Sequence, residues 1–249
     1  MSSERRIVFG AGPVRELVAR RPTAIVELLV AKPGPISDDA AKKGVRISRA
    51  SRPELDQLAG PGATHQGIVA VAGPYEYGDL DDIEAAWTAA QEPALVVVLD
   101  SVTDPHNLGA IVRSAHLCGA HGIVLPRDRS ASVGAVATKA SAGATEHIAI
   151  AQVTNLSRAI DDLKQRGLWL ASVHLSHEAS VPWAIDATGP LGLVLGSEGK
   201  GIRKLVAKQC DFSVAIPMRG GGVGSFNVSV AAGIMLYEVT RQRHGRSGA

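Results

Sequence analysis

Short aliphatic runs alternate with helical patterns from Ala94 onward, and this alternation constrains the fold more than any other feature of the chain. Few polar side chains interrupt the runs at 95–99, 122–125, 168–173, 191–195 and 212–216, as expected of strands buried on both faces. Helical patterns occur between them at 108–117, 133–142, 156–165 and 202–208, and a last helix is expected at 227–242. Strands that alternate with helices predict an α/β fold with a mostly parallel sheet.

The first 73 residues contain the same two kinds of pattern on a smaller scale. Helices are expected at 12–20, 38–43 and 51–58, the last opened by Ser51 and Glu54 at the spacing of a capping box. Strands are expected at 24–30, 45–48 and 67–72. Basic side chains outnumber acidic ones in this stretch, which fits either a face that binds phosphates or an ordinary solvated surface.

An acidic stretch from about residue 74 to 93 separates these two regions. It contains no basic residue, and its acids are Glu76, Asp79, Asp81, Asp82, Glu84 and Glu92. We expect a linker with a short helix near 83–90 that connects the two regions without binding nucleic acid, because its charge repels phosphates. The predicted organisation is a small α/β domain at 1–73, an acidic linker at 74–93 and a larger domain at 94–249.

Composition narrows the class of protein further. The chain has 249 residues and 45% hydrophobic content, which suffices for a buried core in one or two domains, and its net charge of +2 does not by itself indicate nucleic acid. The two cysteines, Cys118 and Cys210, are far apart, and no histidine or cysteine spacing predicts a metal site. No apolar run approaches the roughly 18 residues of a transmembrane helix, so we expect a cytoplasmic protein that does not enter a membrane.

Three glycine-containing stretches each follow an expected strand and precede an expected helix, at 100–115, 193–201 and 216–233. Ligands of parallel α/β sheets bind beyond the carboxyl ends of the strands, so these stretches are predicted to form one composite site. The polar side chains available there are Asn107, Arg113, Glu198, Ser225, Asn227 and Ser229. Taken alone, Arg113 fits either a phosphate or carboxylate clamp or an exposed helix arginine, and Glu198 fits either a reacting group or a solvated turn residue.

Several familiar sites are excluded by position or by absence. The glycines at 220, 222 and 224 lie near the C-terminus, whereas a dinucleotide-binding motif belongs at the first strand-to-helix turn with an acid about 20 residues later. The phosphate-binding P-loop pattern and the G-x-S-x-G pattern of α/β-hydrolases do not occur.

Together, the three stretches resemble the signature motifs of the SpoU/TrmH family of RNA ribose 2′-O-methyltransferases, within the SPOUT superfamily. Residues 9–14 and 63–68 are similar to the ends of the L30e-like RNA-binding domain in the branch that methylates a guanosine of 23S ribosomal RNA. The resemblance implies a C-terminal SPOUT α/β domain tied in a trefoil knot, S-adenosyl-L-methionine as cofactor without a metal, ribosomal RNA as partner and a homodimer.

The resemblance also assigns roles to individual residues. It implies catalytic roles for Arg113, Asn107, Glu198, Ser225 and Asn227. It implies cofactor contacts from Leu195, Gly196, Gly201, Ile216, Met218, Ser225, Phe226, Asn227 and Ser229. Arg113 is proposed in the family to activate the ribose hydroxyl. A guanidinium stays protonated at neutral pH, so a fixed cation that stabilises a developing alkoxide is the easier role.

The third motif departs from the family pattern in one respect. One residue more than usual separates Met218 from Ser225, which places an extra glycine within 220–222, and Phe226 stands where leucine is usual. An added glycine makes the loop more flexible at an entropic cost.

Three functions therefore stay open: methylation of a 23S rRNA guanosine, the same reaction on tRNA or another rRNA nucleotide, and an RNA-binding or ribosome-assembly factor that binds the cofactor weakly.

Overall fold

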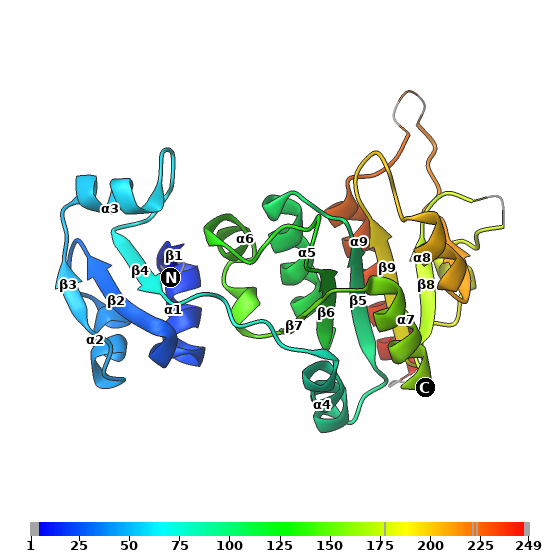
Figure 1. Cartoon of the computed structure of the whole chain (residues 1–249), viewed down its shortest axis with the longest axis horizontal. Helices are drawn as coiled ribbons and strands as arrows, with labels where there is room; N and C mark the ends of the chain where they lie inside the picture. The colour runs from blue at the N-terminus through cyan, green and yellow to red at the C-terminus, as the bar shows by residue number, and fades with distance from the viewer. Residues whose placement is uncertain (1–4, 177, 221, 223, 247–249) are drawn as a thin grey trace. The chain divides into compact units, whose positions relative to one another are not determined.

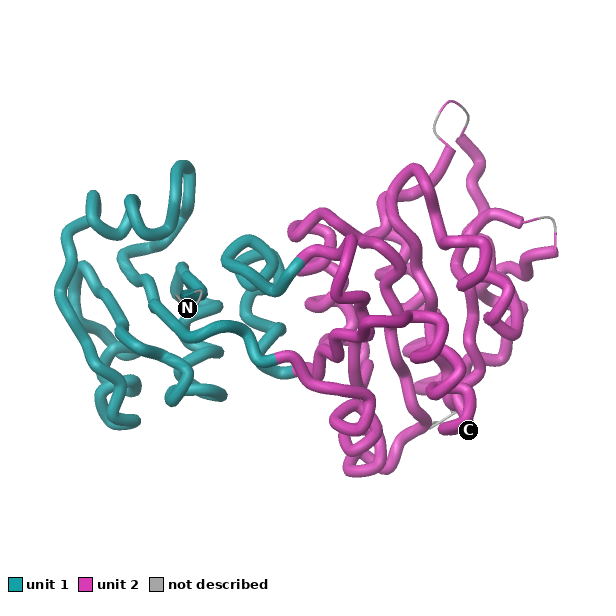
Figure 2. Tube along the Cα trace, viewed as in Figure 1, with its two compact units in different colours: residues 1–76, 132–147 teal, residues 77–131, 148–249 magenta. Residues whose placement is uncertain are grey.

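The computed structural model describes residues 5–176, 178–220, 222 and 224–246, and the chain divides into two compact units (Figure 2). Unit 1 comprises residues 1–76 and 132–147, and unit 2 comprises residues 77–131 and 148–249. These units differ from the predicted domains in two places. The segment 132–147 belongs to unit 1, and most of the acidic stretch belongs to unit 2.

Unit 2 contains a six-stranded sheet in which every pairing is parallel (Figure 1), which confirms the predicted sheet type. The strand order is β10-β8-β9-β5-β6-β7. The strands are β5 (Leu95–Asp100), β6 (Gly122–Pro126), β7 (Ala149–Val153), β8 (Trp169–Val173), β9 (Leu191–Gly196) and β10 (Phe212–Val214). All six residues of β5 are buried, as the uninterrupted aliphatic run predicts.

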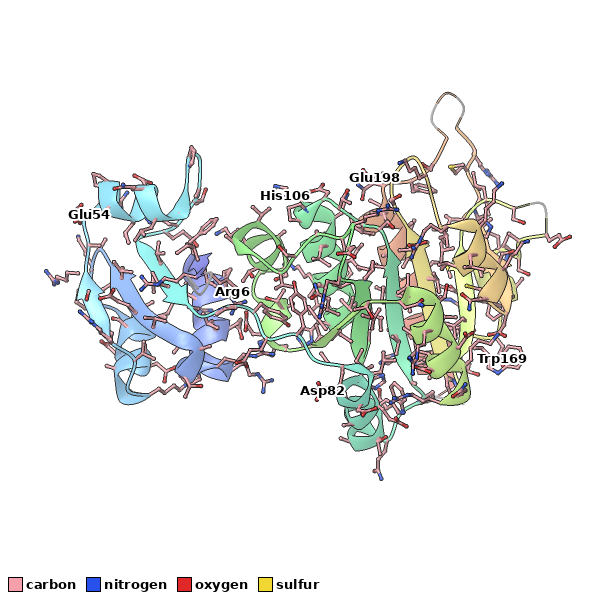
Figure 3. All side chains as sticks on the ribbon, viewed as in Figure 1. Arg6, Glu54, Asp82, His106, Trp169 and Glu198 are labelled. Carbon is pink, nitrogen blue, oxygen red and sulfur yellow. The ribbon has the colours of Figure 1, made fainter. Side chains whose placement is uncertain are left out.

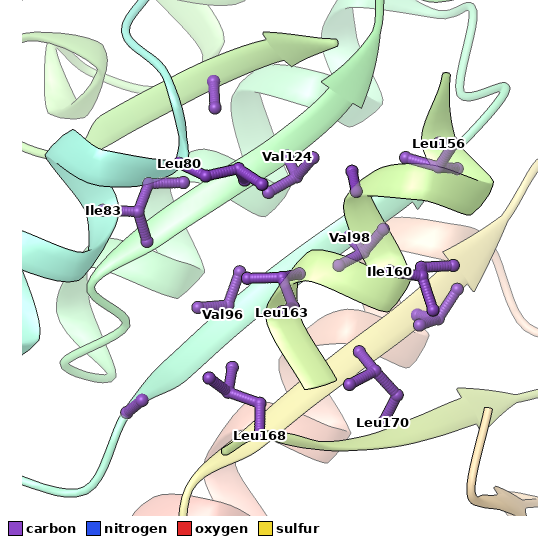
Figure 4. Close-up of a cluster of buried hydrophobic side chains, with 14 of the residues drawn as sticks. Leu80, Ile83, Val96, Val98, Val124, Leu156, Ile160, Leu163, Leu168 and Leu170 are labelled. Atoms are coloured by element: carbon purple, nitrogen blue, oxygen red, sulfur yellow. The ribbon is translucent and has the colours of Figure 1, made fainter. Parts of the chain in front are cut away.

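Helices cover both faces of this sheet. One face carries α4 (Leu80–Ala90), α7 (Leu156–Gln165) and α8 (Lys204–Gln209), whose apolar side chains join those of the strands in one buried cluster (Figure 4). In α4, Ile83 is fully buried in this cluster, so the predicted linker helix is part of the core. On the other face, α5 (Pro105–Leu117) and α9 (Val228–Arg246) pack against each other and contact β6 and β9.

Unit 1 contains a smaller, mixed sheet with the strand order β1-β4-β2-β3. Its strands are β1 (Arg6–Phe9), β2 (Ile25–Val30), β3 (Ile47–Arg49) and β4 (Ile68–Ala72), and its helices include α1 (Ala11–Arg20), α2 (Pro35–Lys42) and α3 (Arg52–Ala59). The predicted capping box opens α3, where the Ser51 amide donates to Glu54 over 2.7 Å. This hydrogen bond lowers the pKa of the Glu54 carboxyl.

The segment 132–147 is tied to the rest of unit 1 by side chains that are distant in sequence. It contains α6 (Ala135–Ala140) and a short 3₁₀ turn, Ala144–Glu146. Arg6 Nη1 lies 2.7 Å from Glu146 Oε1, the Lys139 amine donates to the Thr64 carbonyl, and the Tyr75 hydroxyl donates to the Thr145 carbonyl. The helix expected at 133–142 is present but shorter, and it belongs to unit 1.

Further 3₁₀ turns occur at Pro22–Ala24 and Pro182–Ala184. None of the helices within the described residues has the length and apolar composition needed to cross a membrane.

Candidate active site

Three side chains from the three predicted motifs meet beyond the carboxyl ends of β5 and β9. Asn107 lies in the first turns of α5, Glu198 in the turn after β9 (Figure 3), and Asn227 directly before α9. The Asn107 side-chain amide donates to Glu198 Oε1 over 3.1 Å, and the Asn227 amide donates to Asn107 Oδ1 over 3.0 Å. The Asn227 amide also donates to Glu198 Oε1. We call these three residues the carboxylate–amide network.

The turn that carries Glu198 requires glycine at specific positions. Two backbone hydrogen bonds close it, from Ser197 N to Gly201 O over 3.2 Å and from Gly201 N to Ser197 O over 2.9 Å. Gly199 and Gly201 have φ angles of 81° and 64°, in the left-handed region that glycine adopts without strain. A Cβ on Gly196 would lie 2.1 Å from the carbonyl carbon of Gly201, so the end of β9 and the turn pack without room for a side chain.

Asn227 serves the helix and the network with different atoms. Its Oδ1 accepts hydrogen bonds from Ser229 N over 2.9 Å and Ser229 Oγ over 2.6 Å, which satisfies a free donor at the start of α9. Its Nδ2 then points to Asn107 and Glu198. In this structure Ser229 therefore takes part in the N-terminal cap of α9.

Arg113 is exposed and stands outside the network. Arg113 follows Asn107 by six positions, so the two side chains leave α5 in directions roughly 240° apart around its axis. Within the described part of the chain, Arg113 forms no hydrogen bond or ion pair with Asn107, Glu198 or Asn227. Ser225 is also exposed and lies outside the network. The structure thus leaves the predicted catalytic roles of Arg113 and Ser225 as predictions.

A cavity of about 100 Å³ lies beside the network, where the chain leaves β8 and β10. Four predicted cofactor residues line it: Ile216, Met218, Ser225 and Phe226. Four further lining residues were missed by sequence reasoning: Val173, His174, Leu175 and Ala231. The first three end or follow an aliphatic strand, which is the signal that would have identified them.

The other predicted cofactor residues do not line this cavity. The side chain of Leu195 is buried within the sheet, Gly196 and Gly201 form the Glu198 turn, and Asn227 and Ser229 form the cap of α9. The predicted extra glycine falls within 220–222, and both Gly221 and Val223 lie outside the described residues, so the loop extension stays a prediction.

Sequence reasoning also missed a buried acid at the end of β5. Asp100 is fully buried and accepts hydrogen bonds from Arg203 N over 2.8 Å and from Arg203 Nε over 2.7 Å. The signal in the sequence was the aspartate at the end of an aliphatic strand. A carboxylate buried there requires hydrogen-bonding partners, so it should have been noticed.

Metal ligation finds no support among the described residues, which contain no group of three or more histidine, cysteine or acidic side chains able to hold an ion. The Cys210 thiol is half-buried beside Val206, and burial raises the pKa of Cys210 to about 12.

Both regions of the chain match families that are connected with RNA methylation. Residues 94–237 match the SpoU rRNA methylase family, and residues 7–78 match the RNA 2′-O ribose methyltransferase substrate-binding family. A 23S rRNA (guanosine-2′-O-)-methyltransferase, RlmB, of Xanthomonas campestris is 39% identical over 251 residues, which cover 98% of this chain and all of the relative. An uncharacterized tRNA/rRNA methyltransferase of Mycolicibacterium vanbaalenii is 42% identical over 250 residues, covering 97% of this chain and 78% of the relative.

The fold has a similar counterpart among solved structures. The SpoU methyltransferase AviRb of Streptomyces viridochromogenes, crystallised with the cofactor AdoMet, aligns with a TM-score of 0.80 and 25% sequence identity. The alignment covers 97% of this chain and 91% of AviRb.

Proposed function

Because the chain belongs to the SpoU family of RNA 2′-O-ribose methyltransferases, we propose that it methylates the ribose 2′-hydroxyl of a guanosine in 23S ribosomal RNA. The observation that carries this proposal is the contact of Asn107, Glu198 and Asn227, which come from three separate motifs and meet at one edge of the sheet. The Xanthomonas relative, similar along nearly the whole chain, supports the choice of 23S RNA and of guanosine.

The lining of the cavity suits S-adenosyl-L-methionine in chemical character. Ile216, Met218 and Phe226 offer apolar surface to a flat base, and the hydroxyl of Ser225 offers a hydrogen-bonding group. When bound, this cofactor supplies a methyl group on a positively charged sulfur, an electrophile that needs mainly alignment with the ribose oxygen. The protein's part in the reaction is therefore to position the ribose.

Arg113 and the carboxylate–amide network divide that task. Arg113 is exposed and carries a fixed positive charge, so it can hold an RNA phosphate and stabilise the oxygen anion that develops at the 2′ position. Glu198 accepts hydrogen bonds from two amides, which fixes its carboxylate, and Asn107 is buried and held from both sides. The network thus presents polar groups, held in place by hydrogen bonds, that orient the ribose.

The volume of the cavity favours a second candidate function. At about 100 Å³ it is smaller than the roughly 300 Å³ at which ligand sites usually begin, so the cavity as it stands does not enclose a whole cofactor, and we propose that its lining residues move when the cofactor binds. A chain in which that movement is unfavourable would act as an RNA-binding or ribosome-assembly factor. A third candidate is the same reaction on tRNA or on another rRNA nucleotide, in line with the broader name of the Mycolicibacterium relative.

The test is methyl transfer from radiolabelled S-adenosyl-L-methionine to 23S rRNA, 16S rRNA and tRNA, preceded by calorimetric titration of the cofactor alone. A 2′-O-methyl group blocks alkaline cleavage of the adjacent phosphodiester, so the label is expected in alkali-resistant dinucleotides that begin with guanosine, from 23S rRNA only. Label in tRNA supports the third candidate. Absence of both transfer and cofactor binding, with retained RNA binding, supports the assembly factor.

We further propose a homodimer formed through α5 and α9. These packed helices expose Leu117, Val230 and Tyr237, which are 72%, 48% and 67% accessible, and exposed large apolar side chains favour a protein interface. Analytical ultracentrifugation is expected to give twice the chain mass, and Tyr237→Arg is expected to give the monomer. A monomeric wild-type protein contradicts this proposal.

Two further expectations stay proposals. The trefoil knot follows from the family resemblance alone, and a chain trace from an experimental structure checks it. Ribosomal RNA as substrate places the activity in the cytoplasm, which cell fractionation checks.

A further inference from the structure

Two residues of the carboxylate–amide network, Asn107 and Glu198, follow adjacent strands of the sheet. β5 and β9 pair in parallel, with Asp100 opposite Gly196 at their last register position. The chain continues from Asp100 to Asn107, and from Gly196 to Glu198. The distance between the segments that follow β5 and β9 therefore decides whether Asn107 and Glu198 reach each other.

An ion pair between the buried Asp100 carboxylate and Arg203, whose side chain is 52% exposed, joins the end of β5 to the segment that follows the Glu198 turn. Asp100 is fully buried, and its two carboxylate oxygens accept separately from Arg203, Oδ1 from Nε over 2.7 Å and Oδ2 from the backbone N over 2.8 Å. Such a two-point contact fixes both the side chain and the backbone of Arg203. The hydroxyl of Ser101 donates to the same Oδ1 over 3.2 Å.

Because Arg203 follows the Glu198 turn, its contact with Asp100 fixes the end of that turn. The turn begins at Gly196, is closed by the Ser197–Gly201 hydrogen bonds and ends two residues before Arg203. Its first end is held by β9 and its second by Asp100. Between these anchors lie Gly199 and Gly201, whose freedom of rotation would otherwise let the turn move.

We propose that Asp100 and Arg203 are positioning residues for methyl transfer, which act by holding Glu198 in contact with Asn107 and Asn227. The inference rests on the proposed function, because it assigns these two residues to the same reaction. Neither residue contacts the cavity beside the network, so the pair acts through Glu198 and not on the cofactor. Displacement of a positioning group by about 1 Å can lower a rate by about 100-fold.

A double-mutant cycle tests this dependence on Glu198. Arg203→Ala is expected to lower kcat by about 10- to 100-fold, and Glu198→Ala to lower it at least as much. If Arg203 acts through Glu198, the double variant falls no further than about twofold below Glu198→Ala. Losses that multiply in the double variant overturn the proposal, because they show two independent effects, and an unchanged kcat in Arg203→Ala overturns it as well.

Conservative variants separate positioning from folding. Arg203→Lys keeps the backbone donor to Asp100 and a positive charge, so it is expected to recover part of kcat and to serve as the test where Arg203→Ala does not fold. Lys204→Ala, an exposed neighbour at the start of α8, is the matched control and is expected to retain full activity. Equal losses in the lysine variant, the alanine variant and this control overturn the proposal.

A readout that does not depend on activity distinguishes failure of this inference from failure of the proposed function. In ¹⁵N-labelled protein, the side-chain NH₂ signals of Asn107 and Asn227 report the network directly. Arg203→Ala is expected to shift both pairs of signals toward their positions in Glu198→Ala, and unchanged signals overturn the proposal. A wild-type protein that methylates no RNA removes the proposed function, while these signals still decide whether Arg203 holds the network.

Discussion

Asn107 Nδ2 lies 3.1 Å from Glu198 Oε1, although 91 residues separate the two in the chain. Asn107 is 7% exposed, so its amide is largely removed from water and depends on protein partners. Asn227 supplies the second partner, since its Nδ2 lies 3.0 Å from Asn107 Oδ1. The carboxylate of Glu198 is consequently the acceptor on which both amides converge, and loss of either amide leaves its orientation less determined.

Asn227→Asp is expected to separate the two roles of this residue. The aspartate keeps an oxygen for Ser229 and is as good a helix cap as asparagine, so the free energy of unfolding stays near that of the wild type. It places an oxygen, in place of Nδ2, against Glu198, and we expect kcat to fall at least about tenfold. Asn227→Ala is the control that loses the cap too, at about 1 kcal/mol in urea unfolding. Near-native turnover in Asn227→Asp contradicts a role for the network.

Arg113→Ala is expected to remove nearly all methyl transfer while leaving the fold nearly intact. The side chain is exposed and stands outside the network, so the free energy of unfolding should change by no more than about 0.5 kcal/mol. Loss of a fixed cation at a developing oxygen anion is expected to lower kcat by about 100- to 1,000-fold, with calorimetric cofactor affinity unchanged. Arg158→Ala, which removes another exposed helical arginine, is the matched control. Retained activity in Arg113→Ala removes this residue from the mechanism.

Sequence patterns sufficed for the parallel sheet of unit 2 because its strands are aliphatic on both faces. They failed for β7 and β1, which are short and become strands through pairing with β6 and β4. The alanines of β7 have little strand propensity of their own. Local patterns likewise gave no sign that 132–147 packs with unit 1, because the partner of Glu146 is Arg6, 140 residues away.

The site shows the same division between local and tertiary information. Motif spacing and the rule for strand ends placed Asn107, Glu198 and Asn227 together, and the structure confirms this. The pairing of Asp100 with Arg203 needs the knowledge that β5 lies beside β9, which the sequence order of the strands does not supply.

His121 is expected to make stability depend on pH. Burial lowers the pKa of His121 from 6.5, and its Nδ1 accepts a hydrogen bond from Leu95 N over 3.0 Å, which requires the neutral ring. The unfolded chain therefore binds more protons than the folded chain, and the free energy of unfolding decreases as pH falls through about 6.5. Urea unfolding of wild type and His121→Gln between pH 5 and 8 measures this. The glutamine variant keeps an acceptor without titrating, so an identical pH dependence in both proteins contradicts the assignment.

Glu146 is expected to hold segment 132–147 onto the rest of unit 1 through a buried charge pair. The side chains of Arg6 and Glu146 are 5% and 0% exposed, and Nη1 lies 2.7 Å from Oε1. Glu146→Ala leaves the Arg6 guanidinium buried against Tyr75 without its carboxylate, a change that typically costs about 3–5 kcal/mol. Arg46→Ala is the matched control, because Arg46 is 78% exposed in its pair with Glu27 and its removal should cost no more than about 1 kcal/mol.

The tryptophans allow the effect of Glu146→Ala to be located within the chain. Trp87, Trp169 and Trp183 are the only three, and all belong to unit 2, so tryptophan fluorescence follows unit 2 alone whereas circular dichroism follows both units. The ion pair lies wholly within unit 1, so we expect the urea midpoint measured by circular dichroism to fall while the fluorescence midpoint stays in place. Equal shifts of both midpoints would show that the two units unfold as one cooperative body, and the absence of any shift would show that the buried pair contributes no stability.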